Sequence, residues 1–211
     1  MKEKIVLVGA GGHCKVLIES LDTDTYEIIG VLDNFVSKGT MINGVPVIGN
    51  DASAESLFQA GVHNAAIAIV GNLKIRRTLL DKYTKIGFSF PIIVHPTAHV
   101  SSSAQIGKGT AILAGATINA EAKVQDFATV NTGAIIEHEV LVGENSHVAP
   151  GAILLGASQV GADAMVGAGS IVLQQKKIGN SCTVGAGSIV LRNVADAKTV
   201  YGNPAQEKEM S

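Results

Sequence analysis

The sequence predicts two architectures in one chain: a small α/β domain with a parallel sheet, and then a solenoid of very short strands. Two observations predict them. Between residues 4 and 94, strand-like apolar segments alternate with helical segments, which is typical of a parallel sheet with helices on its faces. From Val94 onward an aliphatic residue recurs every six positions, a period that neither an α-helix nor a single long strand explains.

The first domain is expected to be a small Rossmann-like sheet over residues 1–92. Its first strand, KIVLVGA at 4–10, runs into the glycine turn Gly9-Ala10-Gly11-Gly12-His13. The segments that follow are a helix at 13–21, a strand at 26–32, an extended segment at 45–48, a helix at 53–60, a strand at 65–70, a helix at 73–86 and a strand at 88–94.

The glycine turn indicates a phosphate site. Glycines let the backbone approach a phosphate closely, and the following helix points its free N–H groups at the anion. Asp33 ends the second predicted strand, where an acidic residue can hold a ribose hydroxyl. The turn lacks the third glycine of the dinucleotide fingerprint, because Cys14 stands there, so a plain strand-to-helix turn is the competing interpretation.

The solenoid is expected over residues 93–195. Every position of the six-residue ladder from Val94 to Val190 is aliphatic, and the residue four places later is Ala, Ser, Thr or Cys, apart from Val140, Lys176 and Val194. The aliphatic residue fills the interior and the small one fits the turn, so that each unit forms one wall and stacked coils bury one another. Residues 196–211 abandon the repeat and are expected to form a cap or tail.

The composition excludes several classes of protein. The chain has 211 residues, a formal net charge of -2 and 46% hydrophobic residues, with no tryptophan. This charge gives no basic surface for nucleic acid, and no apolar run approaches the ~18 residues of a membrane span. The N-terminus lacks the features of a secretory signal, and Cys14 and Cys182 form no disulfide or zinc pattern. We therefore expect a cytoplasmic protein.

The segment Ile136-Glu137-His138-Glu139 is the candidate for acid–base chemistry. A neutral imidazole can act as a general base, and an adjacent carboxylate can fix its tautomer. A solvated surface histidine is the bland alternative. One coil is 18 residues long, so Gly156 and Ala120 are expected above and below His138, leaving open space around the ring.

Two further patterns lie in the solenoid. His147 follows His138 by half a coil and falls on a different wall, which argues against a three-histidine metal site with His99. The segment VGAGSIVL occurs at 166–173 and again at 184–191, so the copies are expected to stack as neighbouring turns. Their small side chains would leave a smooth groove for a slender ligand, although good stacking of an ideal repeat also explains the pattern.

These motifs together resemble a known family. The order of domains and the segments GAGGH, LDN, IVGN, IEHE and Ser146-His147 are similar to those of bacterial hexapeptide-repeat sugar O- and N-acetyltransferases. That family includes bacillosamine-pathway N-acetyltransferases, which act on UDP-4-amino-4,6-dideoxy sugars for surface glycans, and sialic acid O-acetyltransferases. The resemblance implies a left-handed parallel β-helix, a homotrimer, acetyl-CoA as donor, a nucleotide sugar as acceptor and no metal.

The resemblance also implies roles for individual residues. His138 would be the general base and Glu139 its supporting carboxylate. His147 would contact acetyl-CoA near the thioester, and Ala168 and Ala186 would line its pantetheine arm. The acceptor nucleotide would lie against six residues of the first domain: Gly11, Gly12, His13, Asp33, Asn34 and Gly71.

Two departures from the family pattern concern the acceptor. The amino-sugar enzymes carry a second acid where this chain has Asn34, and Ser where it has Gly11. The leading prediction is acetyl transfer to an amine of a nucleotide-activated amino sugar. Transfer to a sugar hydroxyl, such as that of sialic acid, is the alternative with the same donor. A non-catalytic nucleotide-sugar-binding scaffold and a metal-dependent hydratase are the alternatives from other classes.

Overall fold

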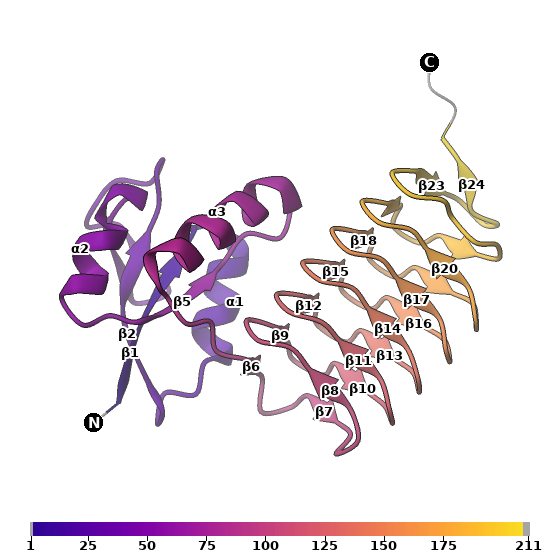
Figure 1. Cartoon of the computed structure of the whole chain (residues 1–211), viewed down its shortest axis with the longest axis horizontal. Helices are drawn as coiled ribbons and strands as arrows, with labels where there is room; N and C mark the ends of the chain where they lie inside the picture. The colour runs from indigo at the N-terminus through magenta and orange to yellow at the C-terminus, as the bar shows by residue number, and fades with distance from the viewer. Residues whose placement is uncertain (1, 209–211) are drawn as a thin grey trace. The chain divides into compact units, whose positions relative to one another are not determined.

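A computed structural model describes residues 2–208, and the chain divides into two compact units, Met1–Ile93 and Val94–Ser211. The first unit carries a five-stranded sheet in the order β3-β4-β2-β1-β5 (Figure 1). The parallel strands are β1 (Glu3–Val8), β2 (Tyr26–Leu32), β4 (Val45–Gly49) and β5 (Asn64–Ile67), and β3 (Met41–Ile42) pairs antiparallel with β4. The helices are α1 (Gly12–Ser20), η1 (Asp51–Ser53), α2 (Ala54–Gln59) and α3 (Leu73–Ile86).

The parallel strands form the core of this unit because they are apolar on both faces. Ile5, Val6, Leu7 and Val8 of β1 are at most 1% exposed, as expected for a central strand covered on two sides. Helix α3 is capped by Asn72, whose side chain accepts a hydrogen bond from Ile75 N, and ends where Gly87 adopts a left-handed φ of 112°.

Because β1, β2 and β5 are parallel neighbours, their carboxyl ends meet at one edge of the sheet. The predicted nucleotide residues lie at this edge.

Three details of the first unit differ from the expectations. The strand expected at 65–70 is β5, which ends at Ile67. The segment 88–94 is not a continuous strand: Ser89 forms one bridge with Asn64, and only β6 (Ile93–Val94) follows. Pro91 lies between them and has no N–H group to donate to a strand partner. The hairpin of β3 and β4 was not predicted, although the Asn43-Gly44 turn that closes it, with both φ values positive, is a recognised hairpin signal.

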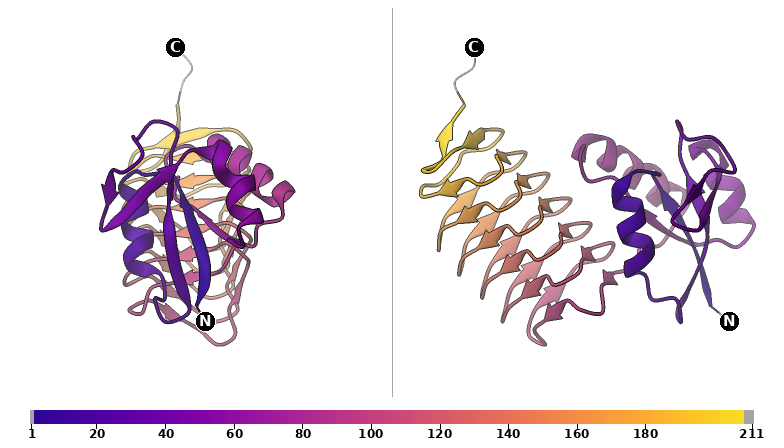
Figure 2. Two further views of the ribbon diagram at one scale, coloured as in Figure 1. Left: turned by 90° about the vertical axis from the view of Figure 1, so that its left-hand side faces the viewer. Right: turned by 180° about the vertical axis from the view of Figure 1, so that it is seen from behind.

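The second unit is a parallel β-helix of two-residue strands, stacked in register (Figures 1 and 2). The first wall consists of β7 (His99–Val100), β10 (Thr117–Ile118), β13 (Ile135–Ile136), β16 (Ile153–Leu154), β19 (Ile171–Val172) and β22 (Ile189–Val190). The second wall consists of β8 (Gln105–Ile106), β11 (Lys123–Val124), β14 (Leu141–Val142), β17 (Gln159–Val160) and β20 (Lys177–Ile178).

The third wall continues to the C-terminal end of the repeat. It contains β6, β9 (Ala111–Ile112), β12 (Thr129–Val130), β15 (His147–Val148), β18 (Met165–Val166), β21 (Thr183–Val184), β23 (Thr199–Tyr201) and β24 (Gln206–Glu207). Strand β24 pairs antiparallel with β23 and so changes the direction of the chain at this sheet edge. At two residues β24 is a very short edge strand, and such strands offer little backbone for further strand pairing.

The six-residue period has a direct structural cause. The ladder residue is the second residue of each short strand, and from Ile112 to Val190 every ladder side chain is at most 2% exposed. Each such side chain contributes about 1.5–3 kcal/mol by leaving water. The small residue four places later lies in the corner turn, and a residue with a left-handed φ recurs at the corners, for example Glu121, Glu139 and Gly151.

Candidate active site

His138 and Glu139 form the corner turn between the first and second walls. The His138 Nδ1 atom lies 3.0 Å from Glu139 Oε2, and both side chains are 59% exposed. Because a carboxylate only accepts hydrogen bonds, Nδ1 carries a proton, and in the neutral imidazole Nε2 then presents its lone pair. His138 thus lies at a corner of the β-helix and not on the face of a wall.

The imidazole lies against Gly156 of the next coil. Ala157 N donates to His138 O at 2.9 Å, and Glu139 N donates to Ala120 O at 3.0 Å, so these three coils stack as expected. A Cβ added at Gly156 would lie 2.6 Å from both Cε1 and Nε2 of His138. The expectation of open space around the ring was therefore wrong on this side, because the ring itself fills the space that Gly156 leaves.

His147 belongs to a second polar pair that includes Asn131. The Nε2 atom of His147 lies 3.1 Å from Asn131 Nδ2. Thr132 N donates to Asn131 Oδ1 at 2.8 Å, which fixes the orientation of the amide and leaves Nδ2 as the donor to the ring. His147 Nε2 is consequently an acceptor, and the ring is the neutral tautomer with its proton on Nδ1. The imidazole is only 6% exposed, so its orientation is fixed by packing as well.

The predicted donor residues follow one corner of the β-helix. Thr132, Pro150, Ala168 and Ala186 occupy equivalent corner turns between the third and first walls. Gly151 N donates to Thr132 O, Gly169 N to Pro150 O and Gly187 N to Ala168 O, which joins these turns into a column. We call this column, together with Asn131 and His147, the donor corner. Ala168 and Ala186 are exposed on it, and their short side chains leave the backbone accessible.

The structure thus brings His147, Ala168 and Ala186 together but leaves His138 and Glu139 apart from them. Within one chain His138 and Glu139 lie on the next corner, with the first wall between them and the donor corner. A single chain therefore carries two parts of the predicted site on different corners.

In the first unit the backbone of the glycine turn is accessible. A Cβ at Gly11, Gly12 or Gly71 would meet nothing within 4 Å, so the backbone faces open space at all three positions. Helix α1 begins after Gly11 with no side-chain cap, and His13 is its second residue. Such an uncapped helix start suits an anion.

Asp33 holds this edge of the sheet together. Its Oδ2 accepts from Ala10 N at 2.8 Å, and its Oδ1 accepts from Phe35 N at 2.8 Å and from Val36 N at 2.9 Å. Burial raises the pKa of the carboxyl, but these backbone N–H donors outweigh burial and hold the pKa below its usual range. Asp33 therefore positions the glycine turn, whatever further contact it makes with a ligand.

Asn34 is held by a residue that sequence reasoning missed. Asn34 Nδ2 donates to Asp51 Oδ2 at 3.1 Å, and Asp51 N donates to Asn34 Oδ1 at 3.2 Å. Tyr83 OH donates to Asp51 Oδ1 at 3.2 Å. Burial, together with the charge of Asp51, raises the pKa of Tyr83, so the phenol stays a donor. Asp51 and Asn131 carried no sequence signal, because each acts through a neighbour that only the fold supplies.

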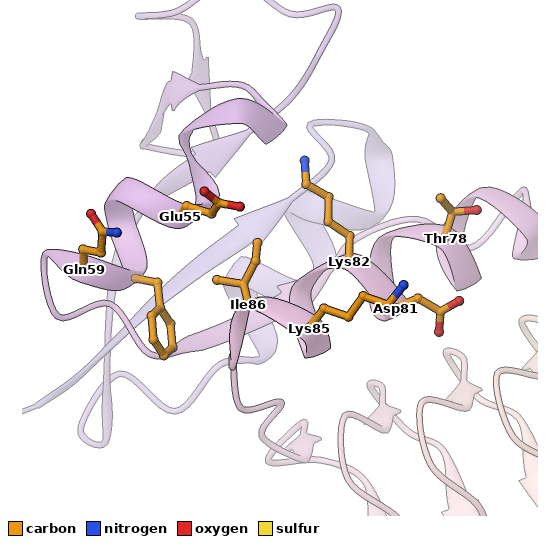
Figure 3. A pocket seen from close by; sticks show the side chains of 8 residues that line it. Glu55, Gln59, Thr78, Asp81, Lys82, Lys85 and Ile86 are labelled. Carbon is orange, nitrogen blue, oxygen red and sulfur yellow. The ribbon is translucent and has the colours of Figure 1, made fainter.

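The cavity of the first unit contains none of the predicted site residues. A cavity of about 710 Å³ lies between α2 and α3 (Figure 3), lined by Glu55, Phe58, Gln59, Thr78, Asp81, Lys82, Lys85 and Ile86. Within residues 2–208 no cluster of three or more His, Cys, Asp or Glu side chains could hold a metal ion. None of the described helices is long and apolar enough to cross a membrane.

Comparison with known proteins identifies the family. Residues 4–83 match the family model described as PglD N-terminal domain. The crystal structure of PerB from Caulobacter crescentus, in complex with CoA and GDP-perosamine, has a TM-score of 0.92 and 36% identity, and covers 98% of this chain and 97% of that chain. The chain belongs to the sugar N-acetyltransferase family.

Further members of the sugar N-acetyltransferase family agree with this assignment. The acetyltransferase domain of PglB from Neisseria gonorrhoeae, in complex with acetyl coenzyme A, has a TM-score of 0.91 and 35% identity, and covers 99% of this chain and 100% of that chain. The UDP-N-acetylbacillosamine N-acetyltransferase of Bacillus subtilis is 36% identical over 115 residues. That match spans about half of each protein, 53% of this chain and 52% of the relative.

Proposed function

We propose that the protein transfers the acetyl group of acetyl-CoA to the amine of a nucleotide-activated amino sugar, for the synthesis of a surface glycan. The hydrogen bond from His138 to Glu139 carries this proposal, because it leaves an unprotonated Nε2 at an exposed corner. Family members with bound CoA and a nucleotide amino sugar support the choice of substrates.

His138 acts as the general base. As the sugar amine attacks the thioester carbonyl, a C–N bond forms and Nε2 takes a proton from the nitrogen. When the tetrahedral intermediate collapses, the C–S bond breaks and the imidazolium returns the proton to the leaving thiolate. Glu139 stabilises the imidazolium through Nδ1, and backbone N–H groups of the adjoining turns stabilise the oxyanion. The thioester is already activated, so no covalent enzyme intermediate is needed.

The first unit binds the acceptor and the donor corner binds acetyl-CoA. The open backbone at Gly11, Gly12 and Gly71 and the uncapped start of α1 suit a diphosphate. His13, Asp33 and Asn34 lie on the same sheet edge, where a sugar nucleotide can meet them. On the donor corner, His147 with Asn131 lies near the thioester, and Ala168 and Ala186 lie along the pantetheine arm.

The placement of these residues supports a homotrimer. A contact between the catalytic corner of one copy and the donor corner of the next is heterologous, and a heterologous contact forms a closed ring when the rotation between copies divides a full turn. A prism with three walls fits a three-fold ring. Since its co-substrates are cytoplasmic metabolites and both described cysteines are free, we place the enzyme in the cytoplasm.

A substrate panel tests the proposal. UDP-, GDP-, dTDP- and CMP-linked sugars, each with an amine or with a hydroxyl at the reacting carbon, would be incubated with acetyl-CoA while free thiol is measured. We expect thiol release with at least one amino sugar and an amide in the product. Release only with hydroxyl sugars would establish O-acetylation instead, and binding without turnover would establish the scaffold.

A further inference from the structure

Arg76 is a buried cation in the first unit. It lies on the inward stripe of α3 with Leu79, Leu80 and Tyr83, and only 3% of its surface is exposed. Its Nε and Nη1 atoms are buried and have no hydrogen-bond partner within residues 2–208, and it forms no ion pair with a carboxylate there. The neighbouring residue on this stripe, Tyr83, has its hydroxyl satisfied by Asp51.

An unpaired buried guanidinium is costly. Removing such a group from water costs several kcal/mol unless an anion and hydrogen bonds compensate. Burial, together with the charge of the neighbouring Arg77, lowers the pKa of Arg76 to about 10. At neutral pH the side chain therefore remains charged and has donors to offer. An anion that enters this site can form both an ion pair and hydrogen bonds with the guanidinium.

The position of Arg76 in the fold indicates which anion. It is the fourth residue of α3, and helical side chains tilt toward the helix N-terminus, so the guanidinium is directed to the carboxyl edge of β5. The glycine turn packs against this segment: a Cβ at Gly9 would lie 2.9 Å from Ile69 Cγ1 and 3.4 Å from Ala68 O. The start of α3 adds its own partial positive charge.

We propose that Arg76 binds the diphosphate of the acceptor nucleotide and fixes it against the glycine turn. This inference rests on the proposed function and adds a guanidinium to a site otherwise built from backbone N–H groups and the side chains of His13, Asp33 and Asn34. A guanidinium binds a phosphate through two parallel N–H donors, which a lysine cannot reproduce. CoA also carries phosphates, so the experiment includes CoA as a separate ligand.

The experiment measures binding and stability of the full-length protein side by side. Calorimetry would titrate UDP, GDP and CoA into the wild type, Arg76→Met, Arg76→Lys and the control Lys74→Met, which removes an exposed cation from the same turn of α3. We expect Arg76→Met to bind the preferred nucleoside diphosphate about 10- to 100-fold more weakly, the value of a lost hydrogen bond to a charged group. Its affinity for CoA should be unchanged, and its ligand-free Tm equal or higher.

Each outcome decides a separate point. If the wild type binds neither UDP nor GDP, the assignment of the first unit as the acceptor site fails together with the inference. If Arg76→Met or a folded Arg76→Lys binds the diphosphate as well as the wild type, the inference alone fails. A lower Tm of Arg76→Met without ligand would show a structural role and overturn it, as would a selective loss of CoA binding. If Arg76→Met does not fold, Arg76→Lys decides, since only a ligand contact predicts several-fold weaker diphosphate binding in a stable protein.

Discussion

Glu139 combines its proposed chemical role with an unfavourable backbone conformation. Its φ of 60° lies in the left-handed region, which glycine adopts at less cost than any residue with a side chain. Glycine occupies the equivalent corner position in other turns, for example at Gly133 and Gly151. The carboxylate that holds His138 Nδ1 at 3.0 Å is therefore kept at a position where stability favours glycine.

Glu139→Gly should separate these two effects. The substitution removes the carboxylate, so we expect kcat to fall about 10- to 100-fold. It also relieves the strain of the left-handed φ, so the Tm should stay equal or rise. Glu121→Gly is the matched control, because Glu121 has a φ of 59° at the equivalent corner of the preceding coil. Steady-state kinetics and thermal unfolding of both variants check this. If the two variants are equally active, Glu139 does not support His138 in the reaction.

Asp33 should link the stability of the first unit to pH. Its pKa is held below the usual value, so its contribution to stability is present above the unfolded pKa of about 3.9 and is lost as the pH falls through the folded pKa. We expect Asp33→Asn to be less stable than the wild type near pH 7, and the difference to shrink below about pH 4. Thermal unfolding across this range measures it. If the difference in stability between Asp33→Asn and the wild type stayed constant across this pH range, the charge of Asp33 would not contribute to its hydrogen bonds with Ala10, Phe35 and Val36.

At the scale of the element, Gly156 shows how the coil shapes the site. Other interior glycines of the solenoid, such as Gly143 and Gly167, lie against the backbone of the next coil, whereas the nearest atoms to Gly156 belong to the His138 ring. A methyl group at Gly156 can be accommodated only if the imidazole moves. The coil therefore fixes the position of the base without a further hydrogen bond.

Gly156→Ala should lower kcat at nearly unchanged Tm. In the His138→Ala background the same change should have no further effect on turnover, because no ring remains to displace. A double-mutant cycle built from the four kinetic measurements gives the coupling between the two positions. Additive effects would show that Gly156 acts on activity through some other route.

The elements differ in how well the sequence predicts them. Helix α3 and strand β2 begin and end at the predicted residues, because their apolar periodicity is uninterrupted. The ladder from Val94 to Val190 predicts the short strands from β6 to β22, since one buried aliphatic per wall leaves no alternative register. It does not predict β23 and β24, which lie in the segment that abandons the repeat. The parts that Asn131, Asp51 and Arg76 play could not be predicted. The hydrogen bonds of Asn131 and Asp51, and the unpaired donors of Arg76, depend on how separate segments pack.

At the scale of the whole molecule, the proposed chemistry needs two corners that one chain keeps apart. His138 lies at the corner between the first and second walls, and the donor corner, with His147 and Ala168, lies between the third and first. An assembly of copies is the simplest way to join them. Light scattering should show three copies at all practical concentrations, and a stable monomer of 21.7 kDa would refute this.

Subunit mixing tests the shared site more sharply. His138→Ala lacks the base and His147→Ala has a weakened donor site, so each homotrimer should be poorly active at limiting acetyl-CoA. Mixed trimers contain interfaces in which an intact His138 meets an intact His147, and co-expression should therefore restore part of the activity. If refolded or co-expressed mixtures are no more active than the separate variants, His138 and His147 act within the same chain and the site is not shared between subunits.

The turnover of His138→Ala at saturating substrates tests the central claim most directly. If His138 is the general base, kcat should fall by ~10²–10⁴, the usual value of a positioned proton transfer. The affinity for acetyl-CoA should change little, because the imidazole faces the reacting amine and most donor contacts lie on another corner. A solvated surface histidine would leave kcat within error of the wild type, and that result would contradict the mechanism while leaving the fold and the family unaffected.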